Sequence, residues 1–225
     1  MRLSFALSIG AGITSFTGGG GKTTAIYCCA RELAEEGAAV GVCTTTHMNA
    51  PDDSSTLVLS ADFLRSDVKN GRTIVVADSC VDGRLCGISD GAFETLAACA
   101  DSVLVEADGA KMFPLKAPRS FEPVIPAGTG RVVGVMGASA MGKTFAEACF
   151  HYELLGVAPD AVITPADMAR IASTVLRKGV ECPFTLLINQ ADAASREDLE
   201  ELASAAQAER IVLASVKLGK WEIYK

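Results

Sequence analysis

The sequence lacks several features that would assign the chain to a familiar functional class. No apolar run reaches the roughly 18 residues that a membrane-spanning helix needs. Only two histidines, His47 and His151, occur in 225 residues, which excludes a multi-histidine metal site. The 20 basic residues are outnumbered by 27 acidic ones, and the net charge is −7. Because nucleic-acid phosphates need a basic surface, we expect neither a nucleic acid nor a membrane as partner.

The eight cysteines include no Cys-x-x-Cys pair, which argues against a zinc ribbon or a dithiol redox motif. Most of them lie in apolar segments. We therefore expect reduced core residues of a cytoplasmic protein. Cys80 and Cys86 lie in a polar stretch, so a metal or redox role stays open for these two.

The N-terminal segment superficially resembles a secretory signal, with one basic residue, Arg2, before an apolar run. That run continues directly into the first expected strand. Cleavage would remove this strand, so we expect the segment to belong to the folded protein.

Short apolar runs alternate with helix-like stretches along the chain. Strands are expected at 13–16, 38–43, 57–59, 73–77, 102–105, 131–136, 161–163, 184–188 and 210–214. Helices are expected at 24–36, 90–99 and 137–155, from 164, and at 195–208. A helical turn is expected at 61–68 and a loop at 51–55. Apolar strands that alternate with helices predict a mostly parallel sheet covered on both faces, in a three-layer α/β/α fold. We expect a single domain over 1–225, with an irregular, proline-rich loop at about 111–129.

A run of four glycines follows the first expected strand and precedes a helix. The expected phosphate ligands are Gly18, Gly19, Gly20, Gly21, Lys22, Thr23 and Thr24. Glycines let successive N–H groups turn inward, so such a loop cradles phosphate oxygens at a helix N-terminus. Lys22 is expected on the outer phosphates and the Thr23 hydroxyl on Mg²⁺. Phe16 replaces the first glycine of the usual motif, and a flexible turn without a ligand is the alternative. The loop makes the predicted fold P-loop NTPase-like.

A second polar cluster, Glu106-Ala-Asp-Gly109, follows the strand at 102–105. Ligands of open α/β sheets collect at the carboxyl ends of strands. Glu106 is therefore the expected acidic partner of Mg²⁺, with Asp108 as a second candidate. The Gly109 N–H is expected on the terminal phosphate. Together with Lys22, the two acids are the expected catalytic residues; a solvated acidic turn is the alternative.

Asn189-Gln-Ala-Asp192 follows the strand at 184–188 and resembles the Asn-Lys-x-Asp motif of guanine-specific proteins. A carboxylate such as Asp192 accepts two hydrogen bonds from the guanine edge, which adenine does not offer. Ser215 and Lys217 follow the next strand, where such proteins carry Ser-Ala-Lys. Guanine is favoured, and adenine or another base stays open, because Gln190 replaces the motif's lysine.

Two further segments carry candidate ligand contacts. Thr45, Thr46 and His47 follow the second strand, where their side chains are expected near Mg²⁺, the γ-phosphate or a substrate. Lys111, Lys116 and Arg119 lie in the proline-rich loop. They are expected to bind an anionic second substrate or to stabilise transferred charge. The alternatives are threonines that merely end a strand and an ordinary basic surface loop.

A second segment, 137–144, matches the simple phosphate-loop pattern more closely than the first one does. Only 47 residues separate its Gly142 from Asn189, too few for the strands that a nucleotide site needs between them. We expect it to be a decoy, with a second phosphate site as the alternative.

Taken together, these segments resemble the YqeC-type family of selenium-dependent hydroxylase accessory proteins. The matching pieces are 15–24, 44–47, 105–111, 114–126, 162–167 and 187–192. The resemblance implies a nucleotide-binding role in the maturation of molybdenum hydroxylases that carry labile selenium, with the hydroxylase or its cofactor as partner. In that family the 137–144 region ends in Gly-Lys-Pro, so Thr144 is incidental.

We therefore expect a Mg²⁺-dependent nucleotide-binding protein that favours GTP over ATP and hydrolyses it. Hydrolysis is expected to be slow, because Ala110 and not a water-orienting glutamine follows Gly109. One alternative is a transferase that moves a phosphoryl or nucleotidyl group to a small anionic acceptor. The other is a nucleotide-sensing chaperone without turnover. The oligomeric state is left open.

Overall fold

The computed structural model describes residues 1–52 and 56–225, so the expected loop at 51–55 lies partly outside the described residues. The chain forms two compact units. The first unit comprises Met1–Phe16, Thr23–Gly109 and Val124–Arg131, and the second comprises Thr17–Lys22, Ala110–Pro123 and Val132–Lys225. The expectation of a single domain over 1–225 stays a prediction.

The first unit contains five parallel strands. In spatial order they are β1 (Gly12–Gly18), β8 (Ser102–Glu106), β2 (Ala39–Thr44), β5 (Arg72–Val76) and β4 (Leu57–Leu59). The register places Glu106 between Phe16 on one neighbouring strand and Thr44 on the other. Because the strands are parallel, the polar residues that follow them collect at one edge.

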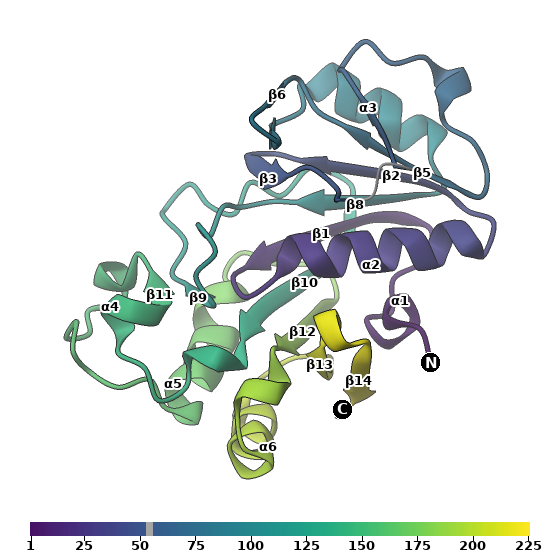
Figure 1. The fold of residues 1–225 in the computed structure, drawn as a ribbon. Coiled ribbons are helices and arrows are strands. Elements are labelled where there is room, and N and C mark those ends of the chain that lie inside the picture. Colours follow the sequence, from purple (N-terminus) through teal and green to yellow (C-terminus); the bar gives the residue numbers. More distant parts are fainter. Residues whose placement is uncertain (53–55) are drawn as a thin grey trace. The chain divides into compact units, whose positions relative to one another are not determined.

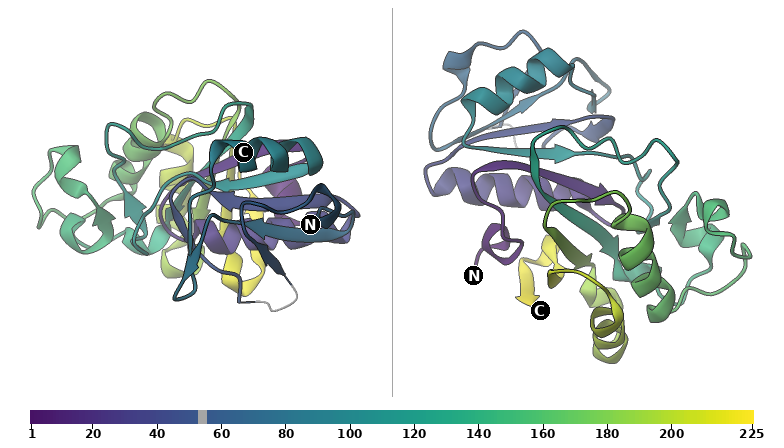
Figure 2. Two further views of the ribbon diagram at one scale, coloured as in Figure 1. Left: turned by 90° about the horizontal axis from the view of Figure 1, so that it is seen from above. Right: turned by 180° about the vertical axis from the view of Figure 1, so that it is seen from behind.

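Helices lie on both faces of these strands (Figures 1 and 2). α2 (Lys22–Glu35) covers one face and α3 (Asp90–Cys99) the other, while the short α1 (Leu3–Ala6) precedes β1. Gly41 in β2 lets α3 approach, since a Cβ there would lie 2.7 Å from a Leu96 methyl carbon. The apolar cluster on this side comprises Cys43, Ile74, Val76, Leu96, Val103 and Val105. The expected helical turn at 61–68 is a 3-10 turn at Arg65–Asp67.

A three-stranded antiparallel sheet was not expected from the sequence. It consists of β3 (His47–Asn49), β7 (Arg84–Cys86) and β6 (Cys80–Val81), in that order. Asp82 and Gly83 connect β6 to β7 with φ angles of 50° and 72°. Two positive φ angles are typical of the tight turn of a β-hairpin.

The second unit contains most of β10 (Thr129–Gly137), together with β12 (Phe184–Asn189) and β13 (Arg210–Ser215), and the three strands are parallel neighbours in that order. β14 (Lys220–Ile223), which was not expected, pairs with β13 in the antiparallel direction. The register aligns Gly137 with Asn189, so the carboxyl ends of β10 and β12 lie side by side.

The two larger helices of the second unit begin where the sequence predicts, and a hydroxyl caps each of them. α5 (Pro165–Arg170) continues into a π-helical segment at Ile171–Leu176, and α6 (Arg196–Ala205) precedes β13. The Thr164 hydroxyl accepts the third N–H of α5, and the Ser195 hydroxyl accepts the equivalent N–H of α6. Each cap satisfies a backbone donor that the helix itself cannot.

Three expectations for the middle of the chain are wrong. The helix expected over 137–155 is replaced by a 3-10 turn at Ala138–Ala140, α4 (Phe145–Ala148), β11 (Cys149–Phe150) and a 3-10 turn at Tyr152–Leu155. The strand expected at 161–163 is reduced to a single bridge between Thr144 and Val162. The proline-rich loop is not wholly irregular, because it contains β9 (Leu115–Lys116), which pairs with β11.

The α/β class and the mostly parallel sheet are confirmed. In the first unit, parallel strands lie between a helix on each face, which is the three-layer arrangement typical of P-loop NTPase-like folds. The antiparallel β14 belongs to the second unit.

Candidate functional site

Gly18, Gly19 and Gly20 lie against other backbone segments of the second unit, and Gly21 lies against the side chain of Asn189. Gly20 has a φ of 81°, and a Cβ there would lie 2.2 Å from the Gly137 nitrogen. A Cβ on Gly21 would lie 2.6 Å from Nδ2 of the Asn189 side chain. Real Cβ atoms do not approach other atoms this closely, so the loop conformation requires glycine at these positions.

Two N–H groups of the loop already have acceptors. Gly19 donates to the Val135 carbonyl at 2.9 Å, and Gly20 donates to the Phe113 carbonyl at 3.0 Å. The first N–H groups of α2, which begins at Lys22, have no intrahelical acceptor. The donors suited to an anion are therefore those of the first turn of α2, rather than those of the whole loop.

Lys22 is buried, with 4% of its surface exposed. Its Nζ donates a hydrogen bond to the Gly18 carbonyl at 2.5 Å, so the ammonium folds back over the loop. Thr17, directly before the glycines, has a buried hydroxyl without a hydrogen-bond partner in the part of the chain that the structure describes. A buried hydroxyl of this kind is commonly satisfied by a ligand or an ordered water.

Asn189 connects the loop to the segment after β13. Its amide nitrogen donates to the Gly20 carbonyl at 2.8 Å, and its amide oxygen accepts the Val216 N–H at 3.1 Å. The side chain is 4% exposed. Both bonds fix the orientation of the amide, so Asn189 joins the loop to the segment after β13.

Asp192 lies three residues further on. Its N–H donates to the Ser215 hydroxyl at 3.0 Å, while its side chain is exposed. Lys217 is exposed as well. Gln190 has a left-handed backbone, with a φ of 58°, and its side-chain oxygen accepts a hydrogen bond from Ser139 at 2.5 Å. The expected base-reading residues Asn189, Asp192 and Ser215 are thus connected within the second unit.

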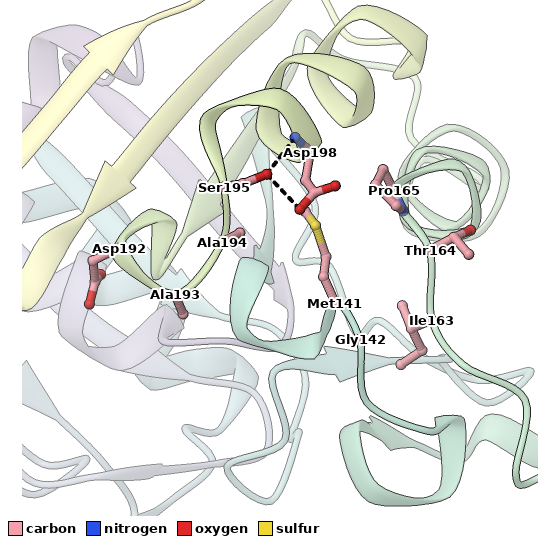
Figure 3. Close-up of a pocket in the computed structure, with 10 residues that line it drawn as sticks. All are labelled: Met141, Gly142, Ile163, Thr164, Pro165, Asp192, Ala193, Ala194, Ser195 and Asp198. Atoms are coloured by element: carbon pink, nitrogen blue, oxygen red, sulfur yellow. Dashed lines mark hydrogen bonds between the residues drawn. The ribbon is translucent and has the colours of Figure 1, made fainter.

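A pocket of about 540 Å³ lies beside Asp192 (Figure 3). It is lined by Met141, Gly142, Ile163, Thr164, Pro165, Asp192, Ala193, Ala194, Ser195 and Asp198. No lysine or arginine is among these lining residues, and two of them are acids. A phosphate group would be repelled here.

The helix that follows the 137–144 segment is also only four residues long. The pocket therefore does not fit the alternative in which this segment binds a second phosphate.

In the first unit, the Thr23 hydroxyl donates to the Glu106 carboxylate at 2.6 Å. Glu106 is 5% exposed, and its backbone carbonyl accepts the Thr44 hydroxyl and the Thr45 N–H. Burial raises the pKa of the nearby Tyr27 hydroxyl, and the Glu106 carboxylate raises it further. The structure thus brings together the two residues that the sequence assigned to Mg²⁺.

The other predicted ligand-binding residues of the first unit differ in burial and in hydrogen bonding. The Thr45 hydroxyl donates to the Val124 carbonyl at 3.0 Å, whereas the Thr46 hydroxyl is buried without a hydrogen-bond partner in the described chain. His47 is exposed on β3, opposite Cys86. Asp108 is 1% exposed, and Gly109 is half-buried. Thr24, in the first turn of α2, is also half-buried.

The three cations of the proline-rich loop differ from one another. Lys111 and Arg119 are exposed, and each lies over an aromatic ring, Phe150 and Phe121 respectively. The Lys116 side chain is completely buried, and its Nζ lies 3.0 Å from a Glu122 carboxylate oxygen. Sequence reasoning missed Glu122. Its signal was available, because it is the only acid between residues 110 and 128.

Two buried cysteines are poorly suited to react as thiolates. Burial raises the pKa of Cys43 and of Cys149 to about 12, so neither forms a thiolate near neutral pH. Within residues 1–52 and 56–225, no cluster of three or more histidine, cysteine or acidic side chains is arranged to hold a metal ion. No helix in this part of the chain is long and apolar enough to cross a membrane.

Comparison with known proteins gives two matches. The YqeC protein family matches residues 14–153, which is more than half of the chain. A relative from Escherichia coli (strain K12), "Uncharacterized protein YqeC", is 29% identical over 173 residues, which cover 71% of this chain and 66% of the relative. The chain thus spans just under two thirds of the relative's length. No solved structure matches the chain.

Proposed function

This chain belongs to the YqeC protein family, and on that premise we propose that it binds a magnesium–nucleoside triphosphate at the loop Gly18–Gly21 and the start of α2. The observation that carries the proposal is the buried Lys22, whose ammonium is held by the Gly18 carbonyl of its own loop. A buried cation beside the first N–H groups of a helix, which have no acceptor within the helix, is suited to a polyphosphate. Calorimetric titration with GTP, ATP and CTP in the presence of Mg²⁺ tests the proposal directly.

The Thr23–Glu106 pair supports the Mg²⁺ part of the proposal. A hydroxyl and a carboxylate are hard oxygen ligands of the kind that Mg²⁺ prefers, and the ion commonly keeps several waters and phosphate oxygens in its shell. Thr23 would contact the ion, and Glu106 would hold one of its waters. When bound, Mg²⁺ would neutralise charge on the phosphates.

Glu106→Gln is expected to remove most of the gain in GTP affinity that Mg²⁺ provides. The amide is neutral, so it attracts the ion and its waters less strongly than the carboxylate does. Titrations with Mg²⁺ and with EDTA measure the gain for each variant. Glu94→Gln, on the exposed side of α3, is the matched control. A Glu106→Gln variant that keeps the full Mg²⁺ gain would contradict the assignment.

The base preference rests on Asp192. Its exposed carboxylate has no side-chain partner among the described residues, and its backbone is fixed by Ser215. A carboxylate in this state is able to accept the two adjacent donors of guanine. Asn189 supports the same segment through its bonds to Gly20 and Val216. We therefore propose GTP as the preferred nucleotide over ATP.

Asp192→Ala is expected to weaken GTP binding by about 10- to 100-fold, which corresponds to one charge-assisted hydrogen-bond pair. ATP affinity is expected to stay constant, because adenine offers no matching donors. Asp160→Ala, an exposed acid of the same unit, is the control. If ATP binds more tightly than GTP and Asp192→Ala changes neither affinity, the base assignment is wrong.

We also propose that the chain hydrolyses the bound nucleotide slowly, since Ala110 follows Gly109 and offers no group to orient water. The biological role proposed from the family is that of a cytoplasmic accessory protein for a selenium-dependent molybdenum hydroxylase. A partner that supplies the missing group would raise the rate of phosphate release. Phosphate release with and without the hydroxylase measures this effect.

A further inference from the structure

Lys116 is a fully buried cation that the proposed nucleotide site does not yet use. Its side chain is 0% exposed, and its Nζ lies 3.0 Å from the carboxylate of Glu122, which is itself 11% exposed. Removing two charges from water is costly, and apolar residues of similar size are commonly at least as stable. A buried pair of this kind beside an anion-binding loop therefore calls for a functional explanation.

The backbone around Lys116 forms a wall against the glycine loop. The Phe113 carbonyl accepts the Gly20 N–H at 3.0 Å. The Leu115 backbone is so close to Gly19 that a Cβ on Gly19 would lie 3.2 Å from the Leu115 nitrogen. Lys116 is the next residue of β9 and carries its ammonium on a flexible four-carbon stem. The backbone segment that carries the Lys116 side chain thus lies next to the loop.

Glu122 is fixed independently of Lys116. Its carboxylate accepts the Arg119 N–H at 3.1 Å, and its own N–H donates to the Arg119 carbonyl at 3.0 Å. These bonds close a tight turn. The carboxylate would therefore keep a donor if the lysine moved away.

We propose that Lys116 is a second phosphate-binding lysine, and that Glu122 is the counter-ion that it exchanges for the polyphosphate of the bound nucleotide. The inference rests on the proposed function and adds a residue to the same site. Lys111 and Arg119 are weaker candidates, because both are exposed to water and lie over aromatic rings. In the bound state, Lys116 and Lys22 would supply two positive charges to one polyphosphate chain.

Titration with inorganic tripolyphosphate in the presence of Mg²⁺ tests the exchange, because this probe has no base or sugar. Lys116→Met is expected to weaken its binding by about 10- to 100-fold, the loss of one or two charge-assisted hydrogen bonds. Lys116→Arg is expected to recover part of the affinity. Glu122→Gln is expected to tighten binding several-fold, because the lysine then has no competing carboxylate.

The opposite signs distinguish exchange from a purely structural ion pair. If the pair only stabilises the proline-rich loop, Lys116→Met and Glu122→Gln lower the melting temperature and both weaken or fail to alter binding. Weaker or unaltered binding by Glu122→Gln overturns the inference. This readout remains decisive even if Lys116→Met fails to fold. Lys178→Met, an exposed lysine of the same unit, is the control for net charge.

Lys22→Ala separates this inference from the proposed function. If Lys22→Ala loses tripolyphosphate binding while Lys116→Met binds like the wild type, only the role of Lys116 is wrong. If Lys22→Ala binds like the wild type, the nucleotide site itself is wrong. The same titrations decide both questions.

Discussion

Lys22→Ala is expected to lower the affinity for Mg²⁺–GTP by at least about 100-fold. The ammonium of Lys22 would contribute about two charge-assisted hydrogen bonds to the phosphates, each worth about 1.5–3 kcal/mol, so about 3 kcal/mol or more is lost. In the free protein the same ammonium donates a hydrogen bond to the Gly18 carbonyl of the loop. Removing the side chain is expected to affect folding less than binding, because a neutral carbonyl is a weaker partner than a polyphosphate. Calorimetry gives the affinity, and thermal unfolding gives the stability.

Two variants control this experiment. Lys22→Arg keeps the charge, but its planar guanidinium has a different reach and geometry, so only partial recovery is expected. Lys178→Ala removes an exposed lysine of the same unit and is expected to bind GTP like the wild type. Equal affinities of the wild type and Lys22→Ala would show that the loop does not hold the phosphates.

The local features of the fold were predictable from short stretches of sequence. α3 was expected at 90–99 and spans Asp90–Cys99. Helices were expected from 164 and at 195–208, and the structure shows helices that begin directly after the capping hydroxyls of Thr164 and Ser195. These elements depend on neighbouring residues alone, so the sequence contains all the information that they need.

The hairpin between Cys80 and Cys86 was predictable but was missed. Asp82-Gly83 between two short strands is a strong turn signal, since both residues tolerate positive φ angles. A metal or redox role now has less support, because the two cysteines lie on the strands of an ordinary hairpin.

The pairing of β9 with β11 was not predictable from local patterns. Residues 137–155 have a helix-favouring composition, yet Gly142 and His151 adopt left-handed backbones and interrupt a helix. Phe150 instead aligns with Lys116, 34 positions earlier in the chain. Such pairing depends on contacts between distant segments, which override local propensity.

In the candidate site, too, some features could be predicted from the sequence and others could not. The spacing of the motifs predicted the loop and Glu106 as ligand-binding positions. The hydrogen bond between Thr23 and Glu106 joins two residues that were both predicted to hold Mg²⁺. The ion-pair partner of Lys116 and the hydrogen-bond partners of Asn189 could not be predicted from the sequence, because the fold determines which side chains meet. Burial of Lys116 changes a surface cation into a paired internal one. That change gives this lysine a specific role to test.

Gly20→Ala is expected to lower the free energy of unfolding by about 3 kcal/mol and to abolish GTP binding. A left-handed backbone costs alanine about 1–2 kcal/mol, and overpacking costs typically about 1–3 kcal/mol more. The new Cβ would lie 2.2 Å from the Gly137 nitrogen and 2.6 Å from its Cα, so either the loop or β10 must move. Movement of the loop would displace the Gly20 carbonyl from Asn189. Urea unfolding measures the stability, and calorimetry below the transition measures binding.

Gly179→Ala separates the two causes of this loss. Gly179 has a φ of 73°, close to that of Gly20, but a Cβ there would meet no atom within 4 Å. Its alanine variant is therefore expected to lose only about 1 kcal/mol, the cost of the backbone conformation, and to bind GTP normally. If both variants lose the same stability, the approach of Gly20 to Gly137 is not tight. The loop would then have room to change shape, and the glycines would matter for their φ angles alone.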